Sequence, residues 1–247
     1  MRSVVCFARL ATFSVDDGRR TDANRAYRSL ALLESSDLKD HERGTNANIL
    51  LTEVQRGFPV ANLRRLLDHD KDAVCSLAWI LSELGEGAIP LLGDVRVLLR
   101  HPARKARFFA IDVVLSCVSQ NEFGLTSQAI DLITDEDSAV RWKVLRLLLL
   151  ANTEQLRNSI MRLPPSRGNL IAWLLDNEAD PRIGIISDKL EAGRKEDRLF
   201  AVVAAARWYP RDEQALRNAL SSDESDVVRF ASSELRLRRS HTYLEGP

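Results

Sequence analysis

Apolar residues in this chain recur at intervals of three and four positions, which is the spacing of one face of an α-helix. Two clear sets are Val140, Val144, Leu147 and Leu148, and Ala201, Val202, Ala205 and Ala206. No run reads as an alternating strand bounded by Asn-Gly or Asp-Gly turns. We therefore predict an all-α protein.

A longer repeat lies on top of this helical period. Residues 132–145 and 220–231 both read as an apolar helix end, an acidic turn and then a Val-Arg pair that opens a second helix. Sites equivalent to this arginine, here called the register positions, recur about 30 residues apart. They are Arg43, Cys75, Arg107, Arg141, Arg167, Arg198 and Arg229. The interval from Arg141 to Arg167 is the shortest, so the hairpin boundaries between residues 155 and 190 stay open.

Residues that favour helix starts precede most register positions. Carboxylates and prolines suit the first turn, where backbone N–H groups lack partners within the helix. Such residues are Asp72, Pro102, Asp137, Pro165, Asp197 and Asp226. One helical hairpin cannot bury its own apolar face, so we expect stacked hairpins to share a continuous core.

The pattern L-x-x-D-x-x-x-x-V-R-x-x-A resembles a HEAT repeat, most clearly over residues 130–151 and 216–238. The resemblance implies a right-handed α-α superhelix of about seven helical hairpins. The resemblance covers roughly residues 25–240. We expect a single domain over residues 1–247, with an N-terminal cap at 1–33 and a frayed tail at 241–247. In that family the turn Asp and Arg bridge adjacent repeats, which would make Asp135, Arg141, Asp223 and Arg229 structural. Cys75 and Arg167 depart from the pattern.

The composition excludes several classes of protein. The 35 Lys and Arg residues balance the 35 Asp and Glu residues, so the chain lacks the basic excess typical of duplex DNA binders. Cys6, Cys75 and Cys117 are far apart and odd in number, which argues against a disulfide framework and a zinc site. The apolar run that begins the chain is too short for a signal peptide. We expect a cytoplasmic protein without a membrane span.

Candidate chemistry is sparse. His69 and His101 share one repeat position, which favours a turn role over metal ligation. Gly85-Glu86-Gly87 lacks the remaining features of a phosphate-binding loop and reads as a helix terminator. The acidic residues 135–137 lack the spacing of a calcium loop. We predict no catalytic residues, no metal and no cofactor.

A binding surface is the remaining candidate. Positions +1, +5 and +9 from each register position fall on one stripe of the second helix, and in HEAT-like solenoids second helices line the concave face. Aromatic residues with arginine are typical of protein interfaces, and a fully packed stripe should not carry this many charges. Packing between repeats stays open as the role of Phe108, Trp142 or Phe230 taken singly. The candidate partner-binding residues, here called the inner stripe, are Phe108, Asp112, Trp142, Arg146, Asp176, Arg207, Glu234 and Arg238.

Three functions fit a HEAT-like chain. The first is a protein-binding module, most specifically a bacterial immunity protein that neutralises a cognate toxin of a contact-dependent or polymorphic toxin system. The second is a HEAT-like DNA glycosylase for alkylated bases, which could recruit Trp79, Trp142, Trp173, Trp208, Asp112 and Arg146. The neutral charge weighs against nucleic acid. The third is a regulatory scaffold similar to the HEAT-like repeats of phycobilin lyases. The sequence does not indicate an oligomeric state.

Overall fold

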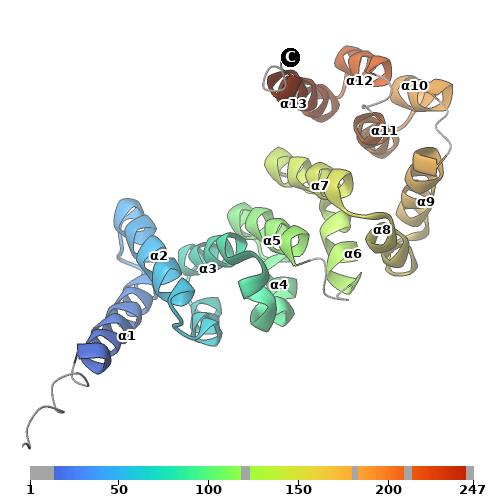
Figure 1. Ribbon diagram of the computed structural model, residues 1–247. Helices are drawn as coiled ribbons and strands as arrows, with labels where there is room; N and C mark the ends of the chain where they lie inside the picture. Colours follow the sequence, from blue (N-terminus) through green and yellow to red (C-terminus); the bar gives the residue numbers. More distant parts are fainter. Residues whose placement is uncertain (1–13, 118–122, 180–182, 209–212, 243–247) are drawn as a thin grey trace, which may run out of the picture. The chain divides into compact units, whose positions relative to one another are not determined.

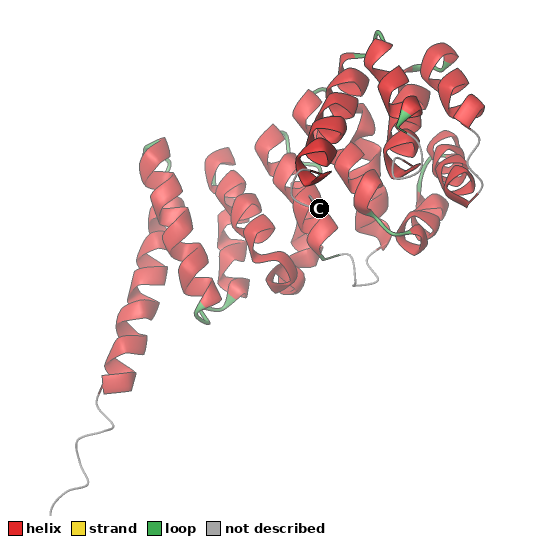
Figure 2. Cartoon of the chain, turned by 45° about the horizontal axis from the view of Figure 1, so that its top comes forward, coloured by secondary structure: helices red, strands yellow, loops and turns green. Residues whose placement is uncertain are grey.

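A computed structural model describes residues 14–117, 123–179, 183–208 and 213–242. Within these residues the chain consists of helices joined by short loops, and no strand occurs among them (Figure 2). The predicted all-α class is confirmed. Cys6, residues 1–13 of the predicted cap and residues 243–247 of the predicted tail lie outside the described residues, whereas α1 (Ser14–Leu33) covers the rest of the cap and the last helix continues to Thr242.

The contacts divide the chain into two compact units, Met1–Asp94 and Val95–Pro247. Each unit has its own set of fully buried apolar side chains. The single domain over residues 1–247 therefore stays a prediction.

In the N-terminal unit, α2 packs against both α1 and α3, and α3 also packs on the 3₁₀ helices η1 and η2 (Figure 1). Leu30, Leu50, Leu63 and Leu77 form a fully buried core. The elements are α1 (Ser14–Leu33), α2 (Asp40–Gln55), η1 (Val60–Asp68), α3 (Lys71–Leu84), η2 (Gly85–Leu91) and the start of α4 (Leu92–Leu98).

One described segment, Lys71–Leu98, is long and apolar enough to cross a membrane by length and mean hydropathy alone. In the fold it is divided into α3, η2 and α4. The break begins at Gly85, whose φ of 54° lies in the left-handed region that favours glycine. Such a segment is equally typical of a core helix, and 44% of its apolar window is buried.

The C-terminal unit holds the remaining helices. They are α5 (Arg104–Ser116), α6 (Phe123–Asp131), η3 (Leu132–Thr134), α7 (Ser138–Leu150), α8 (Thr153–Ser159), η4 (Ile160–Arg162), α9 (Pro165–Ala179), α10 (Ile183–Ala192), α11 (Lys195–Trp208), α12 (Gln214–Asn218), η5 (Ala219–Ser221) and α13 (Ser225–Thr242). Pairs that are consecutive in the chain pack together, including η3 with α7, η4 with α9, α10 with α11 and η5 with α13.

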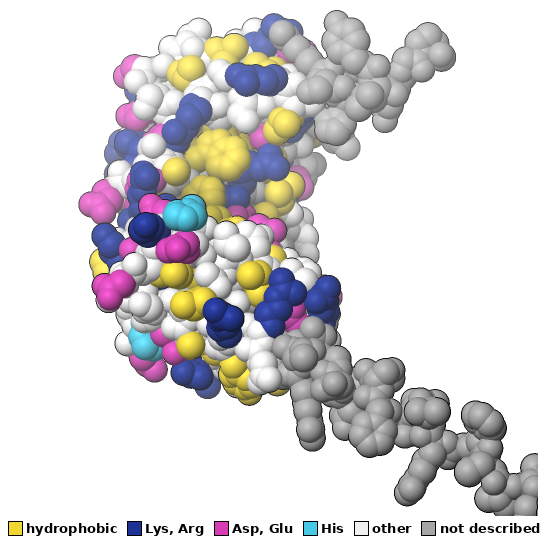
Figure 3. All heavy atoms as spheres, turned by 90° about the vertical axis from the view of Figure 1, so that its left-hand side faces the viewer, with side chains coloured by type: hydrophobic (Ala, Val, Ile, Leu, Met, Phe, Trp, Pro, Cys, Tyr) yellow, Lys and Arg dark blue, Asp and Glu magenta, His cyan; other side chains and the backbone are white. Residues whose placement is uncertain are grey.

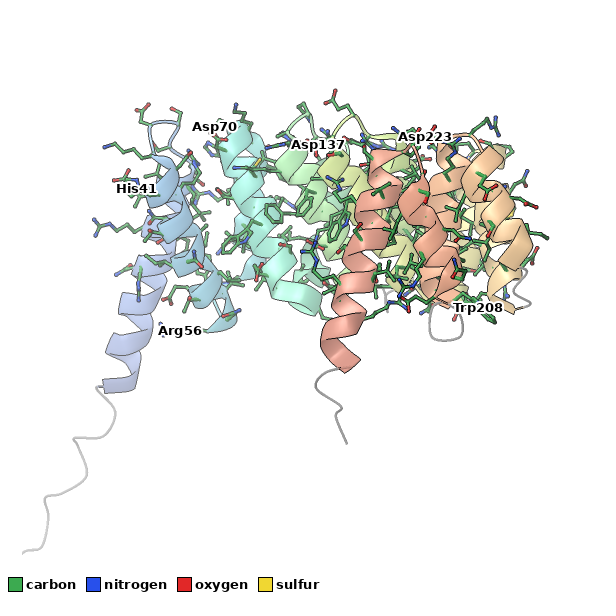
Figure 4. The ribbon with its side chains drawn as sticks, turned by 90° about the horizontal axis from the view of Figure 1, so that it is seen from above. His41, Arg56, Asp70, Asp137, Trp208 and Asp223 are labelled. Atoms are coloured by element: carbon green, nitrogen blue, oxygen red, sulfur yellow. The ribbon has the colours of Figure 1, made fainter. Side chains whose placement is uncertain are left out.

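The register positions all lie in the first two turns of α2, α3, α5, α7, α9, α11 and α13, as predicted. Asp137 caps α7 by accepting from the N–H groups of Ala139 and Val140. The cap of α3 is Asp70 rather than Asp72, which lies in the first turn. Asp137 and Asp223 lie at one end of the helices of the C-terminal unit, and Trp208 lies at the opposite end (Figure 4).

The packing of α13 was not predicted. Simple stacking of hairpins would place each second helix beside its neighbours in sequence. Here α7 packs against α5 and also against α11 and α13, while α9 packs on α11. The last helix therefore returns to a helix that lies three hairpins earlier.

Candidate functional site

The register arginines are used by the architecture. Arg107 donates through Nε and Nη2 to the carboxylate of Asp135 at 2.7 and 2.9 Å, and through Nη1 to the carbonyls of His101 and Pro102. The hydrogen bond with Asp135 raises the pKa of Arg107 above its usual value, against the effect of burial. Asp135 belongs to the next hairpin, so this pair joins two consecutive hairpins.

Other register arginines repeat this arrangement. Arg198 pairs with Asp223 of the next hairpin and donates to the carbonyl of Glu191. Arg43 donates to the carbonyls of Leu33 and Ser35 in its own turn. These side chains join helix ends, so they are not available as a ligand site.

Arg141 departs from the expected pairing with its neighbour. It donates to the carbonyl of Asp135, but its carboxylate partner is Asp226 of α13, at 2.7 Å. Asp226 is 3% exposed and also accepts from Arg229, which in turn donates to the carbonyl of Ser138. Bonds between residues 85 and 91 positions apart therefore fasten the start of α13 to α7.

The inner stripe supplies a second fastening further along the same two helices. Arg146 Nη1 lies 2.6 Å from Glu234 Oε1, and Arg238 Nη2 lies 3.7 Å from Glu234 Oε2. The side chain of Glu234 is 4% exposed. The two fastenings together form the α7–α13 clasp, which consists of Arg141, Arg146, Asp226, Arg229, Glu234 and Arg238.

Arginines at position +9 of the inner stripe cap neighbouring helices. Arg207 Nη1 donates to the carbonyls of Leu148, Leu149 and Ala151, at the end of α7, and its Nη2 pairs with Glu178. Arg238 donates in the same way to the carbonyl of Ala206, near the end of α11. Since carbonyls at a helix C-terminus lack partners within the helix, this placement stabilises both ends.

Together these side chains surround an open hollow of about 540 Å³ in the C-terminal unit. Its charged lining is Arg146, Glu178, Arg207, Glu234 and Arg238, and Leu150, 53% exposed, lies at its edge. The inner-stripe arginines and Glu234 therefore converge, but most of their polar atoms bind one another or backbone.

The other half of the inner stripe is an aromatic and cationic cluster on α5 and α7. Lys143 Nζ lies 2.6 Å from Asp112 Oδ1 and 4.6 Å from the centre of the Phe108 ring. It also lies 5.9 Å from the centre of the Trp142 ring, and the guanidinium carbon of Arg146 lies 6.0 Å from that ring. Phe108, Trp142, Lys143 and Arg146 are all half-buried. This cluster is held in place and still reaches solvent.

Phe230 and Asp176 belong neither to the aromatic and cationic cluster nor to the lining of the hollow. Phe230 is fully buried, so the packing interpretation is correct for it. Asp176 is exposed and does not line the hollow, whereas Glu178 does. Helix α9 packs on α11, and Glu178 is the residue that reaches Arg207 of α11. Asp176 lies two positions earlier, about 200° away around the helix, so it faces solvent.

Lys143 is absent from the predicted inner stripe because it lies one position beyond the counted residues. Cations beside aromatic rings are a recurring source of stabilisation in proteins. The adjacency of Lys143 to Trp142 was therefore a signal in the sequence, but it becomes specific only once the position of Phe108 is known.

The tryptophans considered for a nucleotide groove are not gathered in one place. Trp142 lies in the aromatic and cationic cluster, Trp173 lines a separate hollow with Lys189 5.0 Å from its ring centre, and Trp208 lies beside Leu174 and Asn177. Asp112 is bound to Lys143 and Arg146 to Glu234. Trp79 belongs to α3 of the N-terminal unit.

The turn residues have local roles. His101 Nδ1 accepts from the N–H of Ala103, and burial followed by the charge of Arg107 lowers the pKa of His101. Burial alone would raise the pKa of Asp137, but hydrogen bonds from Arg104 and the helix N–H groups lower it. Among the described residues, no group of three or more His, Cys, Asp or Glu side chains is placed to hold a metal ion.

Comparison with protein-family models and with curated protein sequences finds no match to this chain.

Proposed function

We propose that this chain is a non-enzymatic protein-binding α-solenoid. In this proposal it is a right-handed superhelix of about seven HEAT-like hairpins, acting in the cytoplasm. The aromatic and cationic cluster of Phe108, Trp142, Lys143 and Arg146 is the observation that supports binding most strongly. These side chains are half-buried and fixed by contacts with each other, so little conformational entropy would be lost when a partner covers them.

A protein partner fits this surface better than a small molecule. The hollow beside the cluster is open, and its charged groups are already paired, as expected for the rim of an interface. An exposed leucine, Leu150, continues the apolar surface beyond Trp142 along α7.

The most specific form of the proposal is a bacterial immunity protein that occludes or distorts the active site of a cognate toxin. This step rests on the resemblance to free-standing HEAT-like proteins of similar size, and the fold class alone does not carry it. Purification of the tagged chain from its native host, followed by identification of the proteins that remain bound, tests the binding proposal.

The toxin proposal has its own test. The identified partner, or its toxic domain, is expressed in cells with and without this chain. Growth restored by co-expression supports immunity, whereas a bound partner that is harmless to cells leaves a regulatory scaffold as the function.

A DNA glycosylase for alkylated bases is the alternative. Its candidate Asp112 and Arg146 are engaged in ion pairs, and its tryptophans lie at separate places, which favours the binding module. Release of methylated purines from damaged DNA by the purified chain, abolished by Asp112→Asn, would reverse this preference.

A further inference from the structure

The outward face of α1 in the N-terminal unit has an unusual composition. Between residues 24 and 32 the helix buries one face and exposes the other, and the exposed face carries no carboxylate. Tyr27 is 50% exposed and Leu32 is 37% exposed. The exposed residues, here called the α1 face, are Asn24, Arg25, Tyr27, Arg28, Ala31 and Leu32.

The arginine side chains of the α1 face and of the adjoining end of α2 are exposed to solvent. Arg25 Nη1 and Arg56 Nη1 lie 3.7 and 3.2 Å from the same oxygen of Glu53. Glu53 is 2% exposed, while both arginine side chains are 56% exposed. Arg28, also exposed, forms no ion pair with any described residue. A buried carboxylate therefore holds two guanidinium groups that are more than half exposed, beside Arg28, which has no carboxylate partner among the described side chains.

The aromatic part of this surface is also fixed. The rings of Tyr27 and Phe58 meet edge to face with centres 5.1 Å apart, and Phe58 follows the end of α2. Arg56 lies at the same end of α2 (Figure 4). In the lower part of Figure 3, Lys and Arg side chains lie beside hydrophobic ones on the N-terminal unit. Tyrosine and arginine held in this way are typical centres of protein interfaces.

We propose that the α1 face is a second interaction surface, which binds a protein segment that carries carboxylates next to apolar side chains. Arg25 and Arg28 lie one turn apart and Leu32 lies one turn further, so the segment presents two acidic groups followed by an apolar one. Arginine pairs with carboxylates in bidentate geometry, which gives both charge and directional complementarity. A duplex nucleic acid needs more phosphate contacts than three arginines supply.

The experiment uses the full chain and a phage library of random peptides as the probe. Peptides selected on the wild-type chain are sequenced, and a synthetic consensus peptide is titrated by fluorescence anisotropy. The test variant is Arg25→Gln with Arg28→Gln, which removes both charges without placing a second carboxylate beside buried Glu53. The control is Lys71→Gln with Lys105→Gln, which makes the same charge change at exposed positions in the first turns of α3 and α5. Circular dichroism checks that both variants fold.

We expect acidic and apolar peptides to be enriched. The consensus peptide should bind the test variant at least about tenfold more weakly and the control within about twofold of wild type. Equal binding to the test variant, enrichment of peptides without acidic residues, or no enrichment would overturn the proposal. Binding of a labelled oligothymidine at physiological salt, lost in the test variant while no peptide binds, would instead assign the face to single-stranded nucleic acid.

Discussion

The two units each contain a buried glutamate shared by two arginines, but the arginines face different surroundings. In the N-terminal unit Glu53 is 2% exposed and its partners Arg25 and Arg56 are 56% exposed. In the C-terminal unit Glu234 is 4% exposed, and its partners Arg146 and Arg238 are only 25% and 21% exposed. The same trio therefore presents charge to solvent in one unit and joins two helices in the other.

This difference separates architecture from recognition. In the α7–α13 clasp, the carboxylates Asp226 and Glu234 are buried, and Arg141, Arg146 and Arg238 are at most 25% exposed, so each carboxylate depends on these arginines. Around Glu53, Arg25 and Arg56 are both 56% exposed, so water can replace the carboxylate at either arginine. Stability measurements can therefore distinguish the two roles without knowledge of a partner.

The largest effect is expected at Glu234. Glu234→Ala leaves Arg146 and Arg238 without their carboxylate in a mostly buried site, and loss of one member of such a pair costs about 3 kcal/mol. Urea unfolding of the purified chain measures this loss. A change below about 1 kcal/mol would show that water reaches the clasp freely and that the contrast between the units is wrong.

A smaller effect is expected at Glu53. Glu53→Ala releases two arginines that are already more than half exposed, so the free energy of unfolding should fall by about 1 kcal/mol. The same urea experiment checks this value, with Glu53→Gln as the variant that preserves side-chain volume. A loss as large as that of Glu234→Ala would show that Glu53 and its two arginines stabilise the fold as much as Glu234 and its arginines do.

The smallest effect concerns His101 in the C-terminal unit. Because its folded-state pKa is lowered, the unfolded chain binds the proton more readily, and stability should decrease as pH falls below about 6.5. Protonated Nδ1 can no longer accept from the N–H of Ala103. His101→Asn keeps an acceptor that does not titrate, since an Asn side chain can accept from the N–H two residues ahead.

Unfolding of wild type and His101→Asn across this pH range checks the prediction. Above the ordinary pKa of histidine, the free energies of unfolding of the two proteins should change with pH in parallel. Below it, the free energy of unfolding of the wild type should fall more steeply than that of His101→Asn. Parallel curves at every pH would remove His101 as a source of acid sensitivity.

Much of the fold followed from local pattern. The register positions mark helix starts because the acidic turn and the arginine act on the hairpin that contains them, as at Asp137 and Arg107. The return of α13 to α7 could not be predicted. Asp223 and Asp226 stand in the same turn, and only the packing of the helices decides that Arg198 takes the first and Arg141 the second.

The candidate site, too, could be predicted from the sequence only in part. Counting by helical period placed Arg146, Arg207, Glu234 and Arg238 on one stripe, and these four side chains line one hollow. Their charges were interpreted as available for a partner, whereas the structure pairs them within the chain. Asp176 does not line this hollow, because the packing of α9 on α11 brings Glu178, and not Asp176, to Arg207.

These contacts also change how the binding proposal should be tested. Arg146→Glu would place two carboxylates together at Glu234, so it would disturb the fold and the surface at once. Trp142→Ala is the better test, because Trp142 belongs to the aromatic and cationic cluster and, being uncharged, can be replaced without breaking an ion pair. Trp173→Ala is its matched control, since Trp173 is another half-buried tryptophan of the same unit.

The most direct test of the central claim is the affinity of the co-purified partner for these two variants by isothermal titration calorimetry. The account predicts that Trp142→Ala weakens binding by at least about 2 kcal/mol, as for a central interface aromatic, while Trp173→Ala changes it by less than about 0.5 kcal/mol. Equal affinity of Trp142→Ala and wild type, with both chains folded, would contradict the claim that the cluster on α5 and α7 binds the partner.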